Sequence, residues 1–77
     1  MGYEKEYADF CKKLGMRIKN LREEKKLSLE ELSLITNINI KKLKNLESGC
    51  SERIFFDKHL LKISNALNVD IGLLFEF

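Results

Sequence analysis

Few side chains in this sequence have the types and spacing that catalysis or metal binding requires. His59 is the single histidine, so a histidine-based catalytic triad has one candidate member and no recognisable partner. Cys11 and Cys50 lie far apart, with no second cysteine or histidine at metal-ligand spacing, and we interpret both as free thiols. The four glycines are scattered and form no phosphate-binding loop. We therefore expect no enzymatic activity, no metal and no cofactor.

A run of lysines and amides near the middle of the chain carries a different chemistry. Its charged residues comprise four cations and two acids, namely Lys41, Lys42, Lys44 and Arg53 against Glu47 and Glu52. Lysine donates to guanine O6 and N7, and asparagine pairs bidentately with adenine, so such side chains on one helix face suit the DNA major groove. Taken alone, a lysine-rich face is more often simply solvated. The position of these residues in the fold therefore decides whether they form a DNA-binding face or a solvated one.

The apolar pattern predicts the elements that position this run. A long first helix begins near Tyr3 or Glu6 and ends at Lys25, because apolar residues recur at steps of three and four. The residues of this buried stripe are Tyr7, Phe10, Cys11, Leu14, Ile18 and Leu21. Gly15 is either a weak point of the helix or a site of close packing.

A short second helix is predicted from Leu29 to about Thr36. Ser28 and Glu31 form a capping box, in which the serine hydroxyl and the glutamate carboxylate satisfy each other's backbone amides. Asn37 ends this helix, since asparagine tolerates the left-handed conformation that a tight turn requires.

A third helix follows at once. Asn39 caps it, and Gly49 stops it after about Ser48. Its inward residues, together with one residue of the preceding turn, are Leu43, Leu46 and Ile38.

Two more helices complete the chain. After a loop with an apolar patch at Ile54–Phe56, Asp57 caps a fourth helix that Asn68 ends. Asp70 begins a last short helix, which runs from Ile71 to about Phe75. The inward residues of the fourth helix are Leu60, Leu61, Ile63 and Leu67.

The length and composition fit a single all-α domain, residues 1–77, with five helices. The chain is 44% hydrophobic and 34% charged with no proline, which argues against disorder. Its net charge is +2, which neither requires nor excludes nucleic acid. Neither a membrane-spanning run nor the apolar core of a signal peptide is present, so we expect a cytoplasmic protein with no membrane partner.

Two short helices joined by a tight turn, the second bearing cationic and amide side chains, form the helix-turn-helix arrangement. In these segments the sequence resembles the lambda-repressor-like (Cro and phage-repressor, Xre-type) helix-turn-helix family. The resemblance extends from Leu14 to Phe75 and rests on three segments in order: LGMRIKNLREEKKLSLEELS, TNINIKKLKNLESG and LLKISNALNVDIGLLFE. It implies a compact five-helix domain whose second and third helices, about residues 28–48, form the motif.

The resemblance also implies roles for individual residues. Those at positions that read bases in the major groove are Asn39, Ile40, Lys41, Lys44 and Asn45. Those expected at DNA phosphates are Ser28, Leu29 (through its backbone amide), Lys42, Ser48, Ser51 and Arg53. Arg22 and Glu47 match an ion pair that ties the third helix to the first. For Ile40, packing in the core is an equal alternative.

The sequence departs from the family pattern in the second helix and at the end of the first. Leu29 stands where a DNA-contacting glutamine is usual, and Lys26 stands where a glycine is usual, so we expect slight backbone strain there. Leu34 and Ile35 stand where charged residues are common.

The end of the chain is more apolar than a core of this size should absorb. In the family, the C-terminal helices, about residues 57–75, commonly form a two-fold dimer that reads half-sites about 34 Å apart. The residues expected at this interface are Ile71, Leu73, Leu74, Phe75 and Phe77. The alternative is that Leu74 belongs to the core and Phe77 is a disordered terminus.

The sequence thus predicts a homodimeric transcriptional regulator that binds an inverted-repeat operator in double-stranded DNA. Its length and ending most resemble the controller proteins of restriction-modification operons, and no small-molecule substrate is evident. The alternative is a protein-interaction module, such as an antitoxin subunit, that kept the fold and lost operator binding. Leu29, Leu34 and Ile35 motivate this alternative, because they make the second helix unusually apolar.

Overall fold

The computed structural model describes residues 2–49 and 58–77, and within them it contains four α-helices, one 3-10 helix and no β-strand. These elements are α1 (Gly2–Glu24), α2 (Leu29–Thr36), α3 (Ile40–Ser48), α4 (Lys58–Leu67) and the 3-10 helix η2 (Ile71–Phe75). The all-α prediction is confirmed, and the last of the five expected helices is a 3-10 helix. The expectations for Cys50, Ser51, Arg53, Ile54–Phe56 and Asp57 lie outside the described residues.

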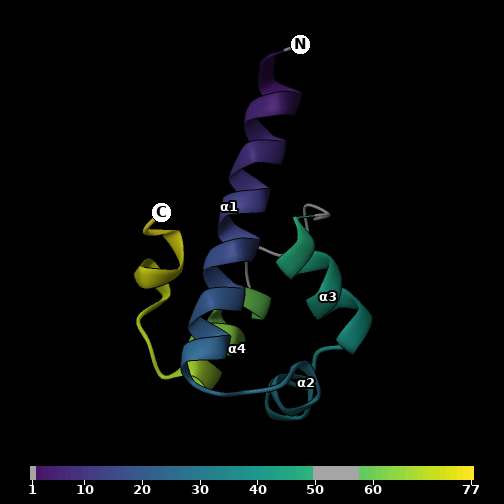
Figure 1. Ribbon diagram of the computed structural model, residues 1–77, viewed down its shortest axis with the longest axis vertical. Coiled ribbons are helices and arrows are strands. Elements are labelled where there is room, and N and C mark those ends of the chain that lie inside the picture. Colours follow the sequence, from purple (N-terminus) through teal and green to yellow (C-terminus); the bar gives the residue numbers. More distant parts are fainter. Residues whose placement is uncertain (1, 50–57) are drawn as a thin grey trace.

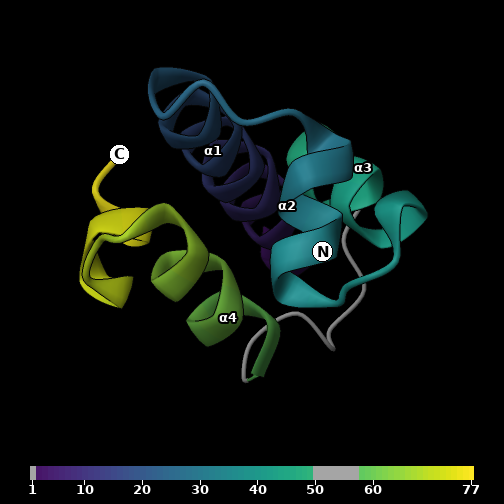
Figure 2. The ribbon, with the colours of Figure 1, turned by 90° about the horizontal axis from the view of Figure 1, so that it is seen from below.

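The long helix α1 organises the arrangement of the other elements. Seen with α1 upright, α3 lies on one side of it and η2 lies on the other, while the first turns of α1 extend beyond both (Figure 1). From below, α2 lies between α4 and α3, and it contacts both (Figure 2). This order places α2 and α3 together at one side of the molecule, away from the C-terminus.

The core draws a side chain from every element. Its buried residues are Leu14, Ile18 and Leu21 of α1, Leu32 of α2, Ile38 of the turn, Leu43 and Leu46 of α3, Leu60, Ile63 and Leu67 of α4, and Leu74 of η2. Two residues predicted to point inward do not. Tyr7 is 37% exposed, on the projecting turns of α1. Leu61 is 52% exposed, because one residue along a helix is a rotation of about 100°, which carries Leu61 away from the face formed by Leu60 and Leu67.

The predicted capping side chains define the starts of α2 and α3. The Ser28 hydroxyl accepts a hydrogen bond from the Glu31 amide at 3.0 Å, and the Glu31 carboxylate accepts one from the Ser28 amide at 2.8 Å. The Asn39 side-chain oxygen accepts one from the Lys41 amide at 2.7 Å. These bonds satisfy amides that a helix start would otherwise leave without partners.

The helices end at residues with left-handed backbone. Asn37 follows α2 with φ of 60°, as predicted, and Lys26 follows α1 with φ of 59°. The Leu27 amide donates to the Arg22 carbonyl at 3.1 Å, which closes a Schellman-type end around Lys26. A lysine in this conformation is strained relative to glycine, so the expected cost at Lys26 is present.

The backbones of α1 and α3 approach each other closely at Gly15. A Cβ atom at this position would lie 2.2 Å from the Leu46 carbonyl oxygen and 2.8 Å from the Glu47 carbonyl oxygen. The absence of a side chain therefore lets the last turn of α3 rest directly on the backbone of α1. Of the two interpretations of Gly15, a weak point of the helix or a site of close packing, the structure supports close packing.

None of the described helices combines the length and the apolar character that crossing a bilayer demands.

We predict that Gly15→Ala destabilises the protein by about 2 kcal/mol, because α3 must shift away from α1. Overpacking costs ~1–3 kcal/mol, and contact with rigid backbone puts this site toward the upper end. Alanine regains only ~1 kcal/mol of helix propensity, so the loss prevails. Urea unfolding measures the difference. Gly72→Ala is the matched control, since no atom lies within 4 Å of its added Cβ. An unchanged midpoint for Gly15→Ala would contradict the close approach.

Candidate nucleic-acid interface

The outward face of α3 carries a stripe of polar side chains. Leu43 and Leu46 are buried, whereas Lys41, Lys44 and Asn45 are exposed on the opposite side at helical spacing. Asn39 is exposed at the start of the helix, with its oxygen engaged by the Lys41 amide. Its NH2 group is therefore the part of this side chain left for a contact outside the protein. We call Lys41, Lys44 and Asn45 the α3 stripe.

The other residues expected at DNA differ in their exposure. Ile40 is half-buried, which fits both of its proposed roles, and Lys42 is exposed. Ser48 is exposed at the last turn, and its hydroxyl donates to the Asn45 carbonyl at 3.0 Å. The Leu29 side chain packs against the core, so only its backbone is placed to face an anion. Ser28 is half-buried at the start of α2.

Arg22 and Glu47 form a nearly buried, bidentate ion pair between α1 and α3. The Arg22 Nε and Nη2 atoms lie 2.7 and 3.0 Å from the two carboxylate oxygens of Glu47. Only 10% of the Arg22 side chain and 7% of the Glu47 side chain are exposed. The hydrogen bond to Glu47 raises the pKa of Arg22 above its ordinary value, against the opposing effect of burial. The guanidinium of Arg22 is therefore held in its charged form.

The same guanidinium also fixes the approach to α2. Its third nitrogen, Nη1, donates to the Leu27 carbonyl at 2.7 Å. Leu27 immediately precedes Ser28, which caps α2. One arginine of α1 thus holds both the last turn of α3 and the first residue before α2.

Hydroxyl groups rigidify the turn between α2 and α3. The Ser33 hydroxyl donates to the Ile38 carbonyl at 2.6 Å. The Thr36 hydroxyl donates to the Leu32 carbonyl at 2.7 Å and accepts from the Ile38 amide at 3.3 Å. Sequence reasoning identified Asn37 and Ile38 here but missed Ser33 and Thr36. The available signal was two hydroxyl residues in the last turn of a helix just before a buried isoleucine.

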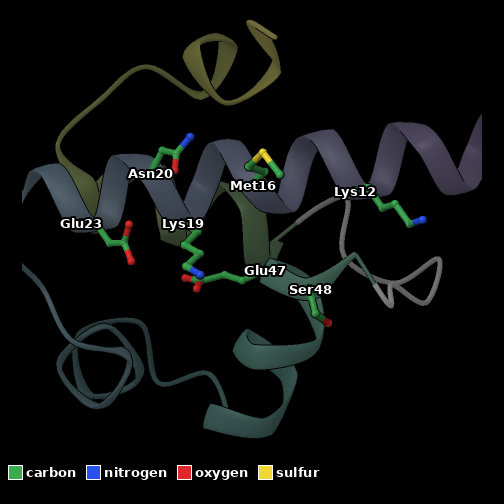
Figure 3. Close-up of a pocket in the computed structure, with 7 residues that line it drawn as sticks. All are labelled: Lys12, Met16, Lys19, Asn20, Glu23, Glu47 and Ser48. Atoms are coloured by element: carbon green, nitrogen blue, oxygen red, sulfur yellow. The ribbon is translucent and has the colours of Figure 1, made fainter.

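A shallow groove lies between α1 and the last turn of α3 (Figure 3). It has a volume of about 430 Å³ and is lined by Lys12, Met16, Lys19, Asn20, Glu23, Glu47 and Ser48. Lys12 and Lys19 of α1 add two positive charges to the lining of this groove. Glu23 and Glu47 add two negative charges. Sequence reasoning placed none of the α1 residues of this groove near the candidate interface.

Positive charge also gathers between α3 and α4. The pKa of His59 lies below its ordinary value because of partial burial and because Lys42 of α3 and Lys62 of α4 repel its protonated form. In the described part of the chain, no cluster of three or more histidine, cysteine or acidic side chains could hold a metal ion.

The residues expected at a dimer interface fall into two groups. Leu74 is wholly buried in the core, so its assignment to that interface is wrong, because η2 turns this side chain toward α1 and α4. Ile71, Phe75 and Phe77 are 40, 38 and 53% exposed. Leu73 is half-buried, and its carbonyl accepts a hydrogen bond from the Arg17 side chain at 3.0 Å.

Comparisons with known proteins identify the family of this chain and a solved structure with a similar fold. Residues 15–76 match a family described as a helix-turn-helix domain. Among solved structures, the chain is similar to the restriction-modification controller protein C.AhdI from Aeromonas hydrophila, with a TM-score of 0.78 and 29% sequence identity. That alignment covers 88% of this chain and 98% of the controller chain. A comparison with curated proteins gave no match.

We predict that Arg22→Ala lowers the free energy of unfolding by ~3 kcal/mol, because Glu47 would keep a nearly buried charge without its partner. Urea unfolding at neutral pH measures the loss. Lys25→Ala, at an exposed position just after α1, is the control and should change stability by less than ~0.5 kcal/mol. Equal stabilities for the two variants would show that the ion pair contributes as little as a surface pair.

Proposed function

This chain belongs to the helix-turn-helix domain family, and we propose that it is a sequence-specific regulator of transcription that binds double-stranded DNA. In this proposal α2 and α3 are the two helices of the motif, and α3 enters the major groove. The observation that carries the proposal is the exposed α3 stripe on a helix that the Arg22–Glu47 ion pair fixes in place. The protein acts in the cytoplasm and needs neither metal nor cofactor.

Base reading is assigned to the α3 stripe and its neighbours. Lys41 and Lys44 donate to guanine O6 and N7, and Asn45 pairs with adenine through both its donor and its acceptor. Asn39 donates from its NH2 group, and Ile40 contacts the methyl group of thymine. Each good bidentate contact of this kind discriminates by ~1–3 kcal/mol against a wrong base.

Phosphate contacts are assigned to the start of α2 and to the ends of α3. The first amides of α2 carry the positive end of the helix dipole, and the Leu29 amide and Ser28 lie at that end. Lys42 and Ser48 contact the flanking backbone, and Ser51 and Arg53 join them on the evidence of the sequence alone. Because local cations rather than the net charge of +2 supply this attraction, binding weakens steeply with salt.

We further propose a homodimer that binds an inverted repeat. Ile71, Leu73, Phe75 and Phe77 supply the C-terminal contact, and the two half-sites lie about 34 Å apart. The similarity to a restriction-modification controller protein supports a role of the same kind. Regulation would follow the concentration of the protein itself, through dimerisation and operator occupancy.

A second candidate is a protein-interaction module. Leu34 and Ile35 of α2 are 83 and 57% exposed, which is more apolar surface than phosphate or base contacts need. An apolar contact would hardly respond to salt, whereas operator binding would weaken strongly.

The decisive experiment is selection of bound duplexes from a random DNA pool at two salt concentrations. We expect enrichment of an inverted repeat whose half-sites are one helical turn apart, with weaker recovery at the higher salt. Loss of all enrichment, at low as well as moderate salt, would favour the protein-interaction module instead.

We predict that Lys41→Ala and Asn45→Ala each remove preference at one operator position while leaving the fold intact, since both side chains are exposed. Titration against the selected operator and single-base variants should show a loss of ~1–3 kcal/mol of discrimination at that position. Lys62→Ala, exposed on α4 outside the stripe, is the charge-matched control for Lys41→Ala. If both stripe variants retain native discrimination, the assigned reading face is wrong.

A further inference from the structure

The first turns of α1 lie outside the part of the chain that matches the family. The match begins at residue 15, yet α1 continues without a break back to Gly2. These turns project past α3 and η2 (Figure 1). Within these turns Phe10 packs against the core, whereas residues 6–9 are exposed.

An aromatic cluster joins this helix end to the C-terminus. The Phe10 ring stacks on Phe75 with centroids 6.1 Å apart, and it meets Phe77 at a tilted angle with centroids 5.7 Å apart. Tyr7 lies one turn before Phe10 on the same side of α1. We call Tyr7, Phe10, Phe75 and Phe77 the terminal aromatic surface.

This surface remains substantially open to solvent. Tyr7, Phe75 and Phe77 are 37, 38 and 53% exposed. Aromatic side chains gain most from full burial, and a contiguous exposed group of them marks an interaction site.

Charged residues beside the surface are arranged with two-fold complementarity. Glu6 and Lys13 are both exposed, and their spacing of seven residues puts them on the same flank of α1, with Phe10 between them. They are ~10 Å apart along the axis, too far to pair within one helix. Two copies of this segment placed antiparallel about an axis near Phe10 bring each Glu6 opposite the partner's Lys13.

We propose that a second copy of this chain covers the terminal aromatic surface, with the two α1 helices antiparallel and two symmetric Glu6–Lys13 ion pairs beside the rings. The inference rests on the proposed function, because it extends the C-terminal dimer contact onto the N-terminal turns of α1. It also fits the arrangement of the fold. Phe75 belongs to η2 and contacts Phe10, and η2 lies on the opposite side of α1 from α3 (Figure 1). Pairing through this surface therefore leaves the α3 stripe uncovered.

The resulting dimer is weak. A few half-exposed aromatic side chains supply much less area than the ~800 Å² per partner of a standard interface. The fraction of dimer therefore depends on protein concentration, as the proposed regulation through dimerisation requires.

The test is the dimer dissociation constant of the full chain, measured without DNA by sedimentation equilibrium. Glu6→Lys and Lys13→Glu each place like charges opposite one another, and we expect each to raise the constant ~10-fold at low salt. The double variant, Glu6→Lys with Lys13→Glu, restores opposite charges and should return to within ~3-fold of the native value. Glu24→Lys and Lys25→Glu repeat the charge changes at two exposed positions, the last residue of α1 and the residue after it, and should leave the constant unchanged.

Circular dichroism melting establishes that each variant is folded. A double variant that stays as weak as the single ones overturns the proposed pairing, and so does a native chain that remains monomeric at every concentration. Duplex selection separates this inference from the proposed function. A chain that selects an inverted repeat but dimerises equally well as Glu6→Lys refutes only the α1 contact. A chain that dimerises as expected but selects no duplex refutes only the DNA-binding role.

Discussion

The nearly buried ion pair between Arg22 and Glu47 is the interaction on which the candidate interface depends. Desolvating two charges is costly, and a well-packed apolar pair could stabilise the fold as much. What an apolar pair lacks is direction. The fork of Arg22 engages both oxygens of Glu47 and the Leu27 carbonyl, so one side chain fixes the end of α3 and the entry to α2 together.

Gly15 and the hydroxyl turn complete this constraint. Gly15 lets the carbonyls of Leu46 and Glu47 rest on α1, which sets how close α3 lies. Ser33 and Thr36 fix the backbone at Ile38, which sets the angle between α2 and α3. The distance of α3 from α1 and its angle to α2 are thus governed by separate contacts, none of which uses a side chain of the α3 stripe. In the proposed regulator, the side chains of the stripe are therefore left free to vary with the operator sequence.

Sequence reasoning succeeded where the physics is local. The Ser28–Glu31 capping box, the Asn39 cap and the left-handed Asn37 depend on residues only a few positions apart. It failed where distant elements decide. Whether Tyr7 is covered depends on how far α1 extends beyond the other helices. Whether Leu74 belongs to the core or to the surface depends on the rotation of η2 about its axis. The Arg22–Glu47 pair was reachable only through the family resemblance, since no local rule joins residues 25 positions apart.

The position of α1 between α3 and η2 has a consequence for how a dimer would read DNA. Because α1 is one continuous helix of 23 residues, a contact at its first turns and the anchoring of α3 near its middle belong to a single rigid element. In the proposed dimer, the crossing angle of the two α1 helices would therefore set the separation of the two α3 helices, and with it the half-site spacing. Dimerisation and base reading would then use different residues, and both would depend on the position of the same rigid helix, α1. Substitutions in the terminal aromatic surface would alter operator spacing or occupancy and leave the preference within each half-site unchanged.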